Sequence, residues 1–124
     1  DDTLNGNAKG GIYENLIADM LTKQGYKLNY YRTENGSTEV EFLISNDAKV
    51  IPIEVKANNG STISLNEMLK RNDIPFGYKF ISGNIGVNDK KIVMPLYMAM
   101  FLWLLIASES VKNKSRTVCS CFLL

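Results

Sequence analysis

The chain has 124 residues, of which 45% are hydrophobic, and this suits one compact domain with a single core. Its 14 Lys+Arg and 13 Asp+Glu leave a net charge of +1, so bulk charge does not indicate a nucleic-acid binder, and any DNA contact must be local. The sequence has no histidine, which excludes histidine triads and zinc–histidine sites.

The two ends of the sequence indicate in which cellular compartment the protein is expected. Cys119 and Cys121 are too close together for an ordinary structural disulfide and too few for a secreted scaffold, so we expect a reducing, cytoplasmic location. The N-terminus lacks the basic and apolar regions of a signal peptide and is typical of the start of a fragment. Residues 121–124 have the form of a prenylation box, which leaves a lipid anchor as the minor alternative.

The first predicted element is a helix over residues 12–24, where apolar side chains recur at helical spacing. Gly10 and Gly11 precede it, and Gly25 suits its C-terminal stop. Glu14 lies at the border of the apolar face rather than in its centre.

Three strands are predicted next, over residues 27–32, 38–44 and 50–56, with tight turns between them. The second strand is expected to alternate, with Val40, Phe42 and Ile44 on one face and Glu39, Glu41 and Leu43 on the other. The third places Ile51, Ile53 and Val55 opposite Pro52, Glu54 and Lys56.

In the second half, a polar loop is predicted over residues 57–61 and a short helix capped by Ser64 over 64–71. A strand over 77–82, a loop over 83–90, a brief strand over 91–94 and a last helix over 96–107 are predicted to follow. The apolar run 92–107 is shorter than the roughly 20 residues of a membrane span, so a buried helix is favoured over a membrane or partner-facing one. We expect residues 108–124 to be poorly ordered.

The candidate site centres on Glu54 and Lys56, which are two residues apart on a strand and therefore emerge on one face. Glu14 on the first helix and Glu41 on the preceding strand complete the order helix, strand, strand, Glu-x-Lys. Mg²⁺ prefers carboxylate oxygens completed by water and substrate phosphate. Glu41 and Glu54 are thus the expected metal ligands, Glu14 a ligand of a second ion or of its water, and Lys56 the group that orients the attacking water.

A plainer interpretation stands beside this one. Charged residues are common on the exposed face of an antiparallel pair, where a Glu–Lys partnership contributes only about 0.2–1 kcal/mol. By the same argument Glu14 is a solvated helix residue, and Arg32 is a salt-bridge partner rather than a phosphate contact.

Five segments together resemble the domain of unknown function found C-terminal to the AAA+ module of many bacterial and archaeal ATP-binding proteins. They are the stretch from Leu4 to Asn15, Tyr31-Arg32, the strand from Glu39 to Ile44, Ile51-Pro52-Ile53-Glu54-Val55-Lys56 and Met94-Pro95-Leu96-Tyr97. The similarity covers residues 4–102, so we expect a domain over residues 1–102, and residues 103–124 to be the end of the last helix with an unmatched tail.

The resemblance implies an α/β fold with a restriction-endonuclease-like, PD-(D/E)XK core, in which a mixed central sheet is flanked by helices. By position it gives the catalytic places to Glu14, Glu41, Glu54 and Lys56. Lys9 and Arg32 are the expected nucleic-acid contacts. The chemistry of these carboxylates makes Mg²⁺ the expected cofactor, and DNA or a protein is the expected partner. The resemblance also implies an N-terminal AAA+ module outside this chain, which itself has no Gly-x-x-x-x-Gly-Lys-Ser/Thr loop for a nucleotide.

One position departs from the family pattern, which usually has Asp where this chain has Glu41. The additional methylene displaces the carboxylate by more than an Å, although Mg²⁺ requires near-octahedral geometry. Two functions are therefore expected: a DNA- or partner-docking module with a degenerate site, or, as the alternative, an active magnesium-dependent DNA endonuclease.

Overall fold

The computed structural model describes residues 6–57 and 61–108. Its elements are α1 (Gly6–Lys23), β1 (Asn29–Arg32), β2 (Glu39–Asn46), β3 (Lys49–Lys56), α2 (Ile63–Leu69), β4 (Gly77–Ile81), β5 (Gly86–Asn88), β6 (Lys91–Pro95) and the 3-10 helix η1 (Leu96–Phe101), followed by α-helical residues 102–108. The predicted disordered tail falls, apart from residue 108, outside the described residues.

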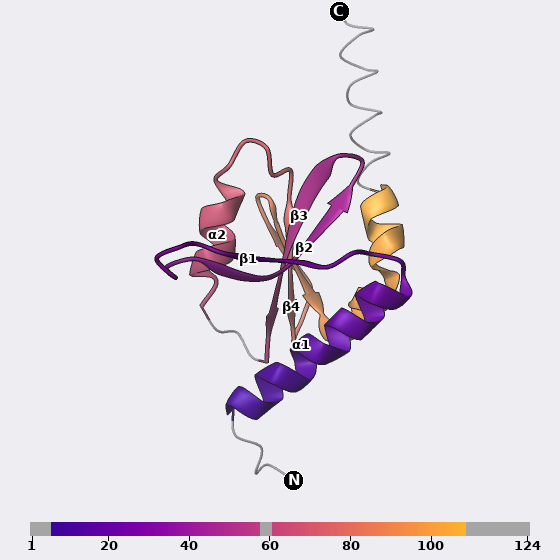
Figure 1. The fold of residues 1–124 in the computed structure, drawn as a ribbon. Helices are drawn as coiled ribbons and strands as arrows, with labels where there is room; N and C mark the ends of the chain where they lie inside the picture. The colour runs from indigo at the N-terminus through magenta and orange to yellow at the C-terminus, as the bar shows by residue number, and fades with distance from the viewer. Residues whose placement is uncertain (1–5, 58–60, 109–124) are drawn as a thin grey trace, which may run out of the picture.

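One six-stranded sheet organises the molecule, with the strand order β1-β2-β3-β4-β6-β5. The pairs β1/β2, β2/β3 and β5/β6 are antiparallel, whereas β3/β4 and β4/β6 are parallel. The connection from β3 to β4 contains α2, as parallel neighbours require a crossover (Figure 1). The expected α/β class, a mixed sheet flanked by helices, is confirmed.

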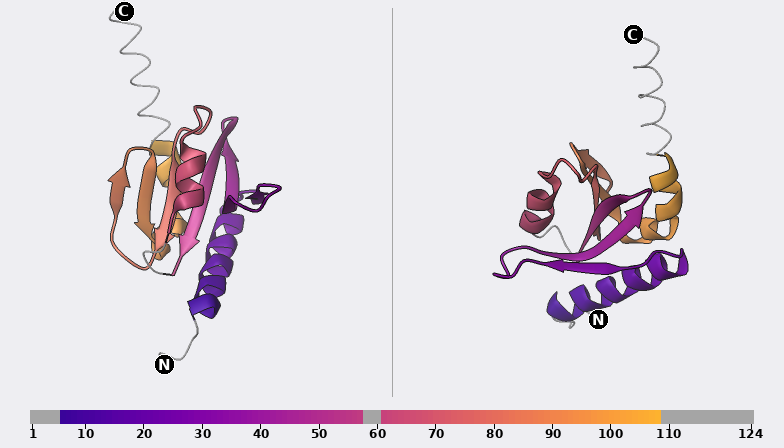
Figure 2. Two further views of the ribbon diagram at one scale, coloured as in Figure 1. Left: turned by 90° about the vertical axis from the view of Figure 1, so that its left-hand side faces the viewer. Right: turned by 45° about the horizontal axis from the view of Figure 1, so that its top comes forward.

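Helices cover both faces of the sheet, α1 and residues 96–108 on one and α2 on the other (Figure 2). The larger core cluster comprises Ile17, Leu21, Ile44, Ile51, Ile53, Val55, Tyr78, Phe80, Met94, Ala99, Leu102 and Ile106. The smaller one, beneath α2, comprises Val40, Leu65, Met68, Leu69 and Ile74. Because β4 is central and covered twice, all five of its residues are buried.

The predicted turns are confirmed. Gly25 ends α1 with a φ of 89°, and the N–H of Tyr26 donates to the carbonyl of Leu21 at 3.1 Å. Gly36 has a φ of 68° and its N–H donates to the carbonyl of Thr33 at 2.8 Å.

Three predicted boundaries were wrong. The helix α1 begins at Gly6 rather than at residue 12 and runs through Gly10 and Gly11, because glycine costs a helix about 1 kcal/mol without removing a backbone hydrogen bond. The predicted loop 83–90 contains the short edge strand β5. The N-cap of α2 is Thr62 and not Ser64, whose hydroxyl instead accepts a hydrogen bond from the N–H of Glu39 at 3.2 Å.

The predicted faces of β2 were also wrong in part. Phe42 and Ile44 pack in the larger cluster, but Val40 lies in the cluster beneath α2, together with the partly buried Leu43. The β1/β2 register shifts at this point, since Asn29 pairs with Leu43 and Tyr31 with Val40. Such an irregularity interrupts the two-residue alternation on which the prediction depended.

The last helix is divided where one unbroken helix was expected. The Gln24 side chain donates from Nε2 to the carbonyl of Ala99 at 2.6 Å and accepts from the N–H of Trp103 at 3.2 Å. These are the two backbone groups that an α-helix would join directly, so the amide is inserted into the helical hydrogen-bond ladder. The 3-10 helix therefore precedes this point, and α-helix follows it.

This final segment is buried on one side only, which differs from the expected buried helix. Ala99, Leu102 and Ile106 face the core. Its exposed apolar side chains are Tyr97, Met100, Phe101, Trp103 and Leu104. Within residues 6–57 and 61–108, no helix combines the length and the hydropathy needed to cross a bilayer.

The packing predicts a large stability difference between two positions on β3. Ile53→Ala removes a fully buried side chain between the sheet and α1, and we expect the free energy of unfolding to fall by about 2–5 kcal/mol. Val50→Ala, at a position of the same strand that is 36% exposed, should cost less than about 1 kcal/mol. Urea denaturation would measure both, and equal costs would contradict the assignment of the core.

Candidate functional site

Strand β3 positions the two central residues of the predicted site. Because side chains alternate along a strand, Ile53 and Val55 enter the larger core while Glu54 and Lys56 point to the face that bears α2. Glu54 is only 2% exposed, although Lys56, at the end of the strand, keeps a side-chain exposure of 32%. The interpretation of these charges as an exposed-face pair therefore does not hold for Glu54.

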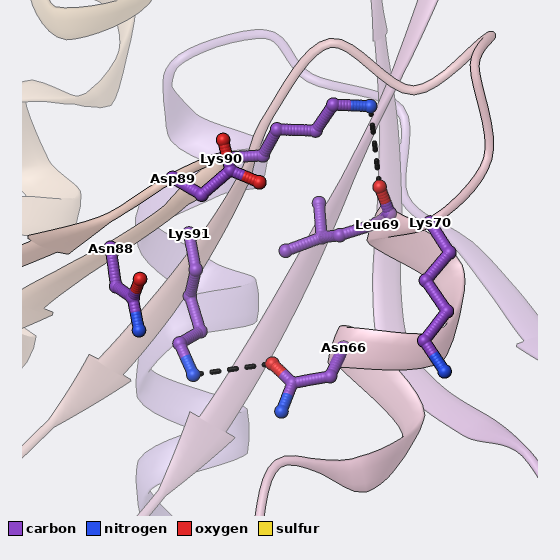
Figure 3. Close-up of a pocket in the computed structure, with 7 residues that line it drawn as sticks. All are labelled: Asn66, Leu69, Lys70, Asn88, Asp89, Lys90 and Lys91. Atoms are coloured by element: carbon purple, nitrogen blue, oxygen red, sulfur yellow. Dashed lines mark hydrogen bonds between the residues drawn. The ribbon is translucent and has the colours of Figure 1, made fainter.

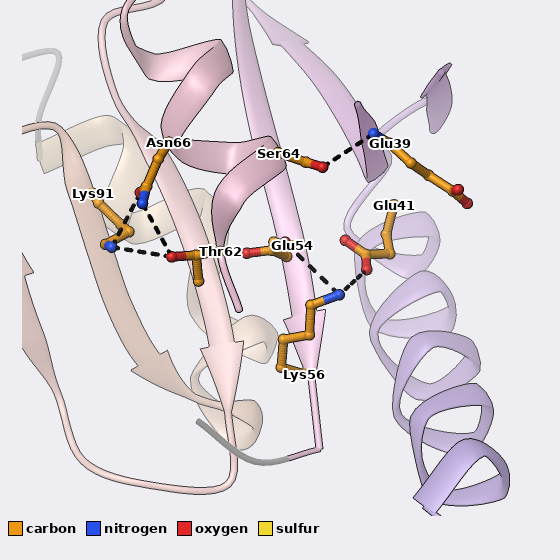
Figure 4. A network of polar contacts seen from close by, with 8 residues as sticks. All are labelled: Glu39, Glu41, Glu54, Lys56, Thr62, Ser64, Asn66 and Lys91. Atoms are coloured by element: carbon orange, nitrogen blue, oxygen red, sulfur yellow. Dashed lines mark hydrogen bonds and ion pairs between the residues drawn. The ribbon is translucent and has the colours of Figure 1, made fainter. Parts of the chain in front are cut away.

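Lys56 brings the two predicted carboxylates together (Figure 4). Its Nζ donates to Glu41 Oε1 at 2.8 Å and lies 3.7 Å from Glu54 Oε1. Glu41 is itself largely buried, with a side-chain exposure of 15%. One positive charge thus stands between two carboxylates that come from neighbouring strands.

The second oxygen of each carboxylate lacks a donor. Glu41 Oε2 and Glu54 Oε2 are both buried and accept no hydrogen bond within the described part of the chain. A buried carboxylate oxygen without a partner is costly, and a cation is one way to satisfy it. The pair therefore has unused capacity for a positively charged ligand.

Burial and charge both act on the protonation of this cluster. Burial raises the pKa of Glu54, Lys56 opposes this rise, and Glu41 adds to it. Burial acts to lower the pKa of Lys56, but the hydrogen bond to Glu41 and the surrounding carboxylates outweigh it and raise that pKa. Lys56 is therefore a fixed cation and is not available as a neutral base near pH 7.

Glu14 lies nearby on α1 and is coupled to the same charges. Partial burial raises its pKa, Glu41 adds to the rise, and Lys56 opposes it. Glu14 is not among the residues that line the pocket at Glu54. In residues 6–57 and 61–108, no three acidic or cysteine side chains are gathered in an arrangement that could hold a metal ion as they stand.

The carboxylates open into a pocket of about 430 Å³, the acidic pocket, which lies between the sheet and the start of α2. Its lining consists of Ser37, Glu39, Glu41, Glu54, Lys56, Ser61, Ile63 and Ser64. Three glutamates and one lysine are among these residues, so the pocket is negative overall. Neither Lys9 nor Arg32, the predicted nucleic-acid contacts, lines it.

Sequence reasoning missed Lys79 on β4, which is 3% exposed and pairs in register with Glu54 on the adjacent strand. Burial lowers its pKa, although the charge of Glu54 opposes this. A single charge between Tyr78 and Phe80, in an otherwise apolar strand, was the signal that could have identified it. It also missed Lys91 on β6, whose charge reaches Glu54 as well.

The chemistry of the two carboxylates suits a hard divalent cation, although within the described residues their present arrangement does not form a metal site. Glu41 and Glu54 each offer a buried oxygen without a hydrogen-bond donor, and Mg²⁺ takes one or two protein carboxylates together with water and phosphate. Side-chain rotation around the Lys56 ammonium would be needed to turn both oxygens to one ion.

The raised pKa of Glu54 predicts a pH-dependent stability effect. The folded state holds the Glu54 proton up to a higher pH than the unfolded state does, so the free energy of unfolding falls as the pH rises above the ordinary value of 4.5. In metal-free buffer, Glu54→Gln should therefore be more stable than the wild type at pH 7. The difference should disappear below pH 4.5. Urea denaturation at the two pH values measures it, and a less stable variant at pH 7 would contradict the prediction.

Comparison with known proteins adds one finding. No curated protein and no solved structure matches the chain. The family model described as "Domain of unknown function (DUF4143)" matches residues 9–99, which include all of the site, all six strands and most of the helices. Since this match spans well over half of the sequence, the chain belongs to the DUF4143 family.

Proposed function

We propose that this chain is a nuclease-like domain of the PD-(D/E)XK type that docks on DNA through a divalent cation held by Glu41 and Glu54. The observation that supports it best is the pair of buried carboxylate oxygens without donors on either side of Lys56. The order α1, β2, β3 with Glu14, Glu41, Glu54 and Lys56, and the mixed sheet around it, agree with such a core.

The sign of the pocket explains why a cation is needed. Three glutamates and one lysine line it, so a phosphodiester, which is itself anionic, would be repelled from the protein alone. Mg²⁺, when bound, supplies the positive charge that draws a phosphate into the pocket and offsets the charge that develops there during cleavage. The protein's part is to hold both carboxylates in place and to exclude bulk water from Glu54.

The chain's own residues divide this work. Glu54, fixed in a central strand, is the rigid ligand, whereas Glu41 lies next to the β1/β2 register shift. Lys56 prevents the two carboxylates from repelling each other while the cation is absent, and its ammonium can then contact a phosphate oxygen. Glu14 adds negative charge from the side of α1.

Binding of DNA should therefore depend on Mg²⁺ and on Glu54. We expect Mg²⁺ to tighten binding of a labelled duplex by about tenfold, or about 1.4 kcal/mol, and Glu54→Gln to abolish this gain. Asp19→Asn removes a carboxylate that is paired with Lys23 on the exposed surface of α1 and serves as the matched control. Fluorescence anisotropy with Mg²⁺ or with a chelator measures the difference, and equal affinities in the two buffers would contradict metal-dependent docking.

Cleavage is the second candidate function, and the position of Lys56 favours it. Its ammonium lies beside both carboxylates, where it can orient a water molecule toward a phosphate and offset negative charge on the reacting group. Glu41, in the place where the family pattern has Asp, sets the limit on this chemistry. Its longer side chain reaches Lys56 and forms the shorter of the two ion pairs.

Shortening this side chain should increase cleavage. Glu41→Asp withdraws the carboxylate from Lys56, and we expect it to nick plasmid DNA in Mg²⁺ at least about tenfold faster than the wild type. Lys56→Gln in the Glu41→Asp background should return the rate to background, while Asp19→Asn should leave it unchanged. If neither the wild type nor Glu41→Asp nicks plasmid above background, the site is a docking site alone.

The exposed apolar side of residues 97–104 supports a protein partner for the same domain, and an N-terminal AAA+ module is the partner that we propose. Tyr97, Met100, Phe101, Trp103 and Leu104 lie on this side, and each is between 46% and 62% exposed. Large exposed apolar side chains gathered on one helical segment are typical of interaction sites. It lies across the sheet from α2 and the acidic pocket, so a partner there would leave the pocket open.

A further inference from the structure

A second pocket, the basic pocket, lies at the other end of α2 and has a charge opposite to that of the acidic pocket (Figure 3). Its volume is about 280 Å³, and its lining consists of Asn66, Leu69, Lys70, Asn88, Asp89, Lys90 and Lys91. Three lysines and a single acidic residue therefore line this space. Such an excess of positive charge in a concave region is suited to an anion.

Lys90 supplies a fixed charge to this pocket. Its Nζ donates to the carbonyls of Leu69, Arg71 and Ile74 at 3.2, 3.1 and 3.0 Å. An ammonium has three N–H donors, so all of them are occupied and the group cannot turn away. Carbonyl partners leave its positive charge uncompensated, and Lys90 forms no ion pair with any described residue.

Lys91 is the group in the pocket that can bind a ligand directly. It is half-buried, donates to Asn66 Oδ1 at 3.2 Å, and lies 3.5 Å from Thr62 Oγ1. At least one of its three N–H donors is left for a ligand. No carboxylate of the described residues is paired with it, although Lys70 across the pocket is paired with Glu67.

The basic pocket and the acidic pocket share one face of the sheet. The charges of Lys79 and Lys91 both act on Glu54, which shows that the two sites are within electrostatic reach of each other. Thr62, a contact of Lys91, lies between Ser61 and Ile63, which line the acidic pocket. Figure 4 shows Lys91 and Asn66 of the basic pocket on the same side of the sheet as Glu54 of the acidic pocket. A chain of phosphates could therefore contact both without leaving this face.

We propose that Lys91 and Lys70 bind a backbone phosphate of the same nucleic-acid strand whose neighbouring phosphate enters the acidic pocket. The path of the strand rests on the proposed function, whereas anion binding in the basic pocket depends only on the geometry of that pocket. Lys90 contributes a fixed positive charge, while Lys91 and Lys70 contribute donors. The two pockets then place one strand along α2, where the acidic pocket binds it through a cation and the basic pocket binds it directly.

The test compares lysine variants that each remove one positive charge. Lys91→Gln and Lys70→Gln should each weaken binding of a labelled duplex by about threefold to tenfold, and should reduce the slope of log affinity against log salt by about one. Lys91→Arg should restore wild-type affinity. Lys23→Gln, on the exposed surface of α1, is the matched control and should bind like the wild type. Thermal melting confirms that each variant is folded.

The outcomes separate this inference from the proposed function. If Lys91→Gln and Lys70→Gln bind DNA with wild-type affinity and salt slope while Mg²⁺ still tightens binding, the inference is wrong and the proposed function stands. If Mg²⁺ has no effect but Lys91→Gln still weakens binding, the proposed function fails and the basic pocket stands. If inorganic phosphate binds through Lys91 without competing against DNA, the pocket takes a free anion and the nucleic-acid path is overturned.

Discussion

The burial of one carboxylate, Glu54, is the constraint around which this structure is organised. A glutamate that is 2% exposed in a central strand is unfavourable unless positive charge surrounds it. Lysines on β3, β4 and β6 supply that charge: Lys56 near its oxygen, Lys79 in register beside it, and Lys91 further away. Burial still prevails and raises the pKa of Glu54. The strand thus keeps a ligand group partly unsatisfied within an otherwise well-packed sheet.

Much of the fold could be predicted from the sequence because its signals are local. Gly25 and Gly36 mark turns that need positive φ, and the alternation along β3 correctly separates Ile53 from Glu54. The errors arose where distant contacts decide the outcome. The register shift opposite β1 moves Val40 to the other face, and no property of β2 alone indicates it.

The candidate site was predictable in its residues but not in its depth. Spacing places Glu54 and Lys56 on one face, and the order of elements brings Glu41 next to them. That Glu54 is buried depends on β4 and α2, which follow it in the chain, and Lys79 enters the site only through the parallel pairing of β3 with β4. The pairing partners of a parallel strand are not encoded in its own sequence.

The opposite charge of the two pockets follows from the position of α2 over the sheet. Its start lies near the carboxylates of β2 and β3, whereas the carbonyl of Leu69 at its end accepts a hydrogen bond from Lys90 in the turn between β5 and β6. The helix therefore separates a negative region from a positive one on a single face. This arrangement is consistent with the net charge of +1, because the local charges cancel in the total.

The hydrogen bonds of the Gln24 amide restrict which amino acids can occupy position 24. The side chain there must present a donor to the carbonyl of Ala99 and an acceptor to the N–H of Trp103 at the same time. An ionised glutamate offers no donor, lysine and arginine offer no acceptor, and asparagine has the same amide on a shorter side chain. Glutamine is thus the one side chain of this length that can join the end of α1 to the final helix, so an uncharged residue near the surface is more narrowly specified than many in the core.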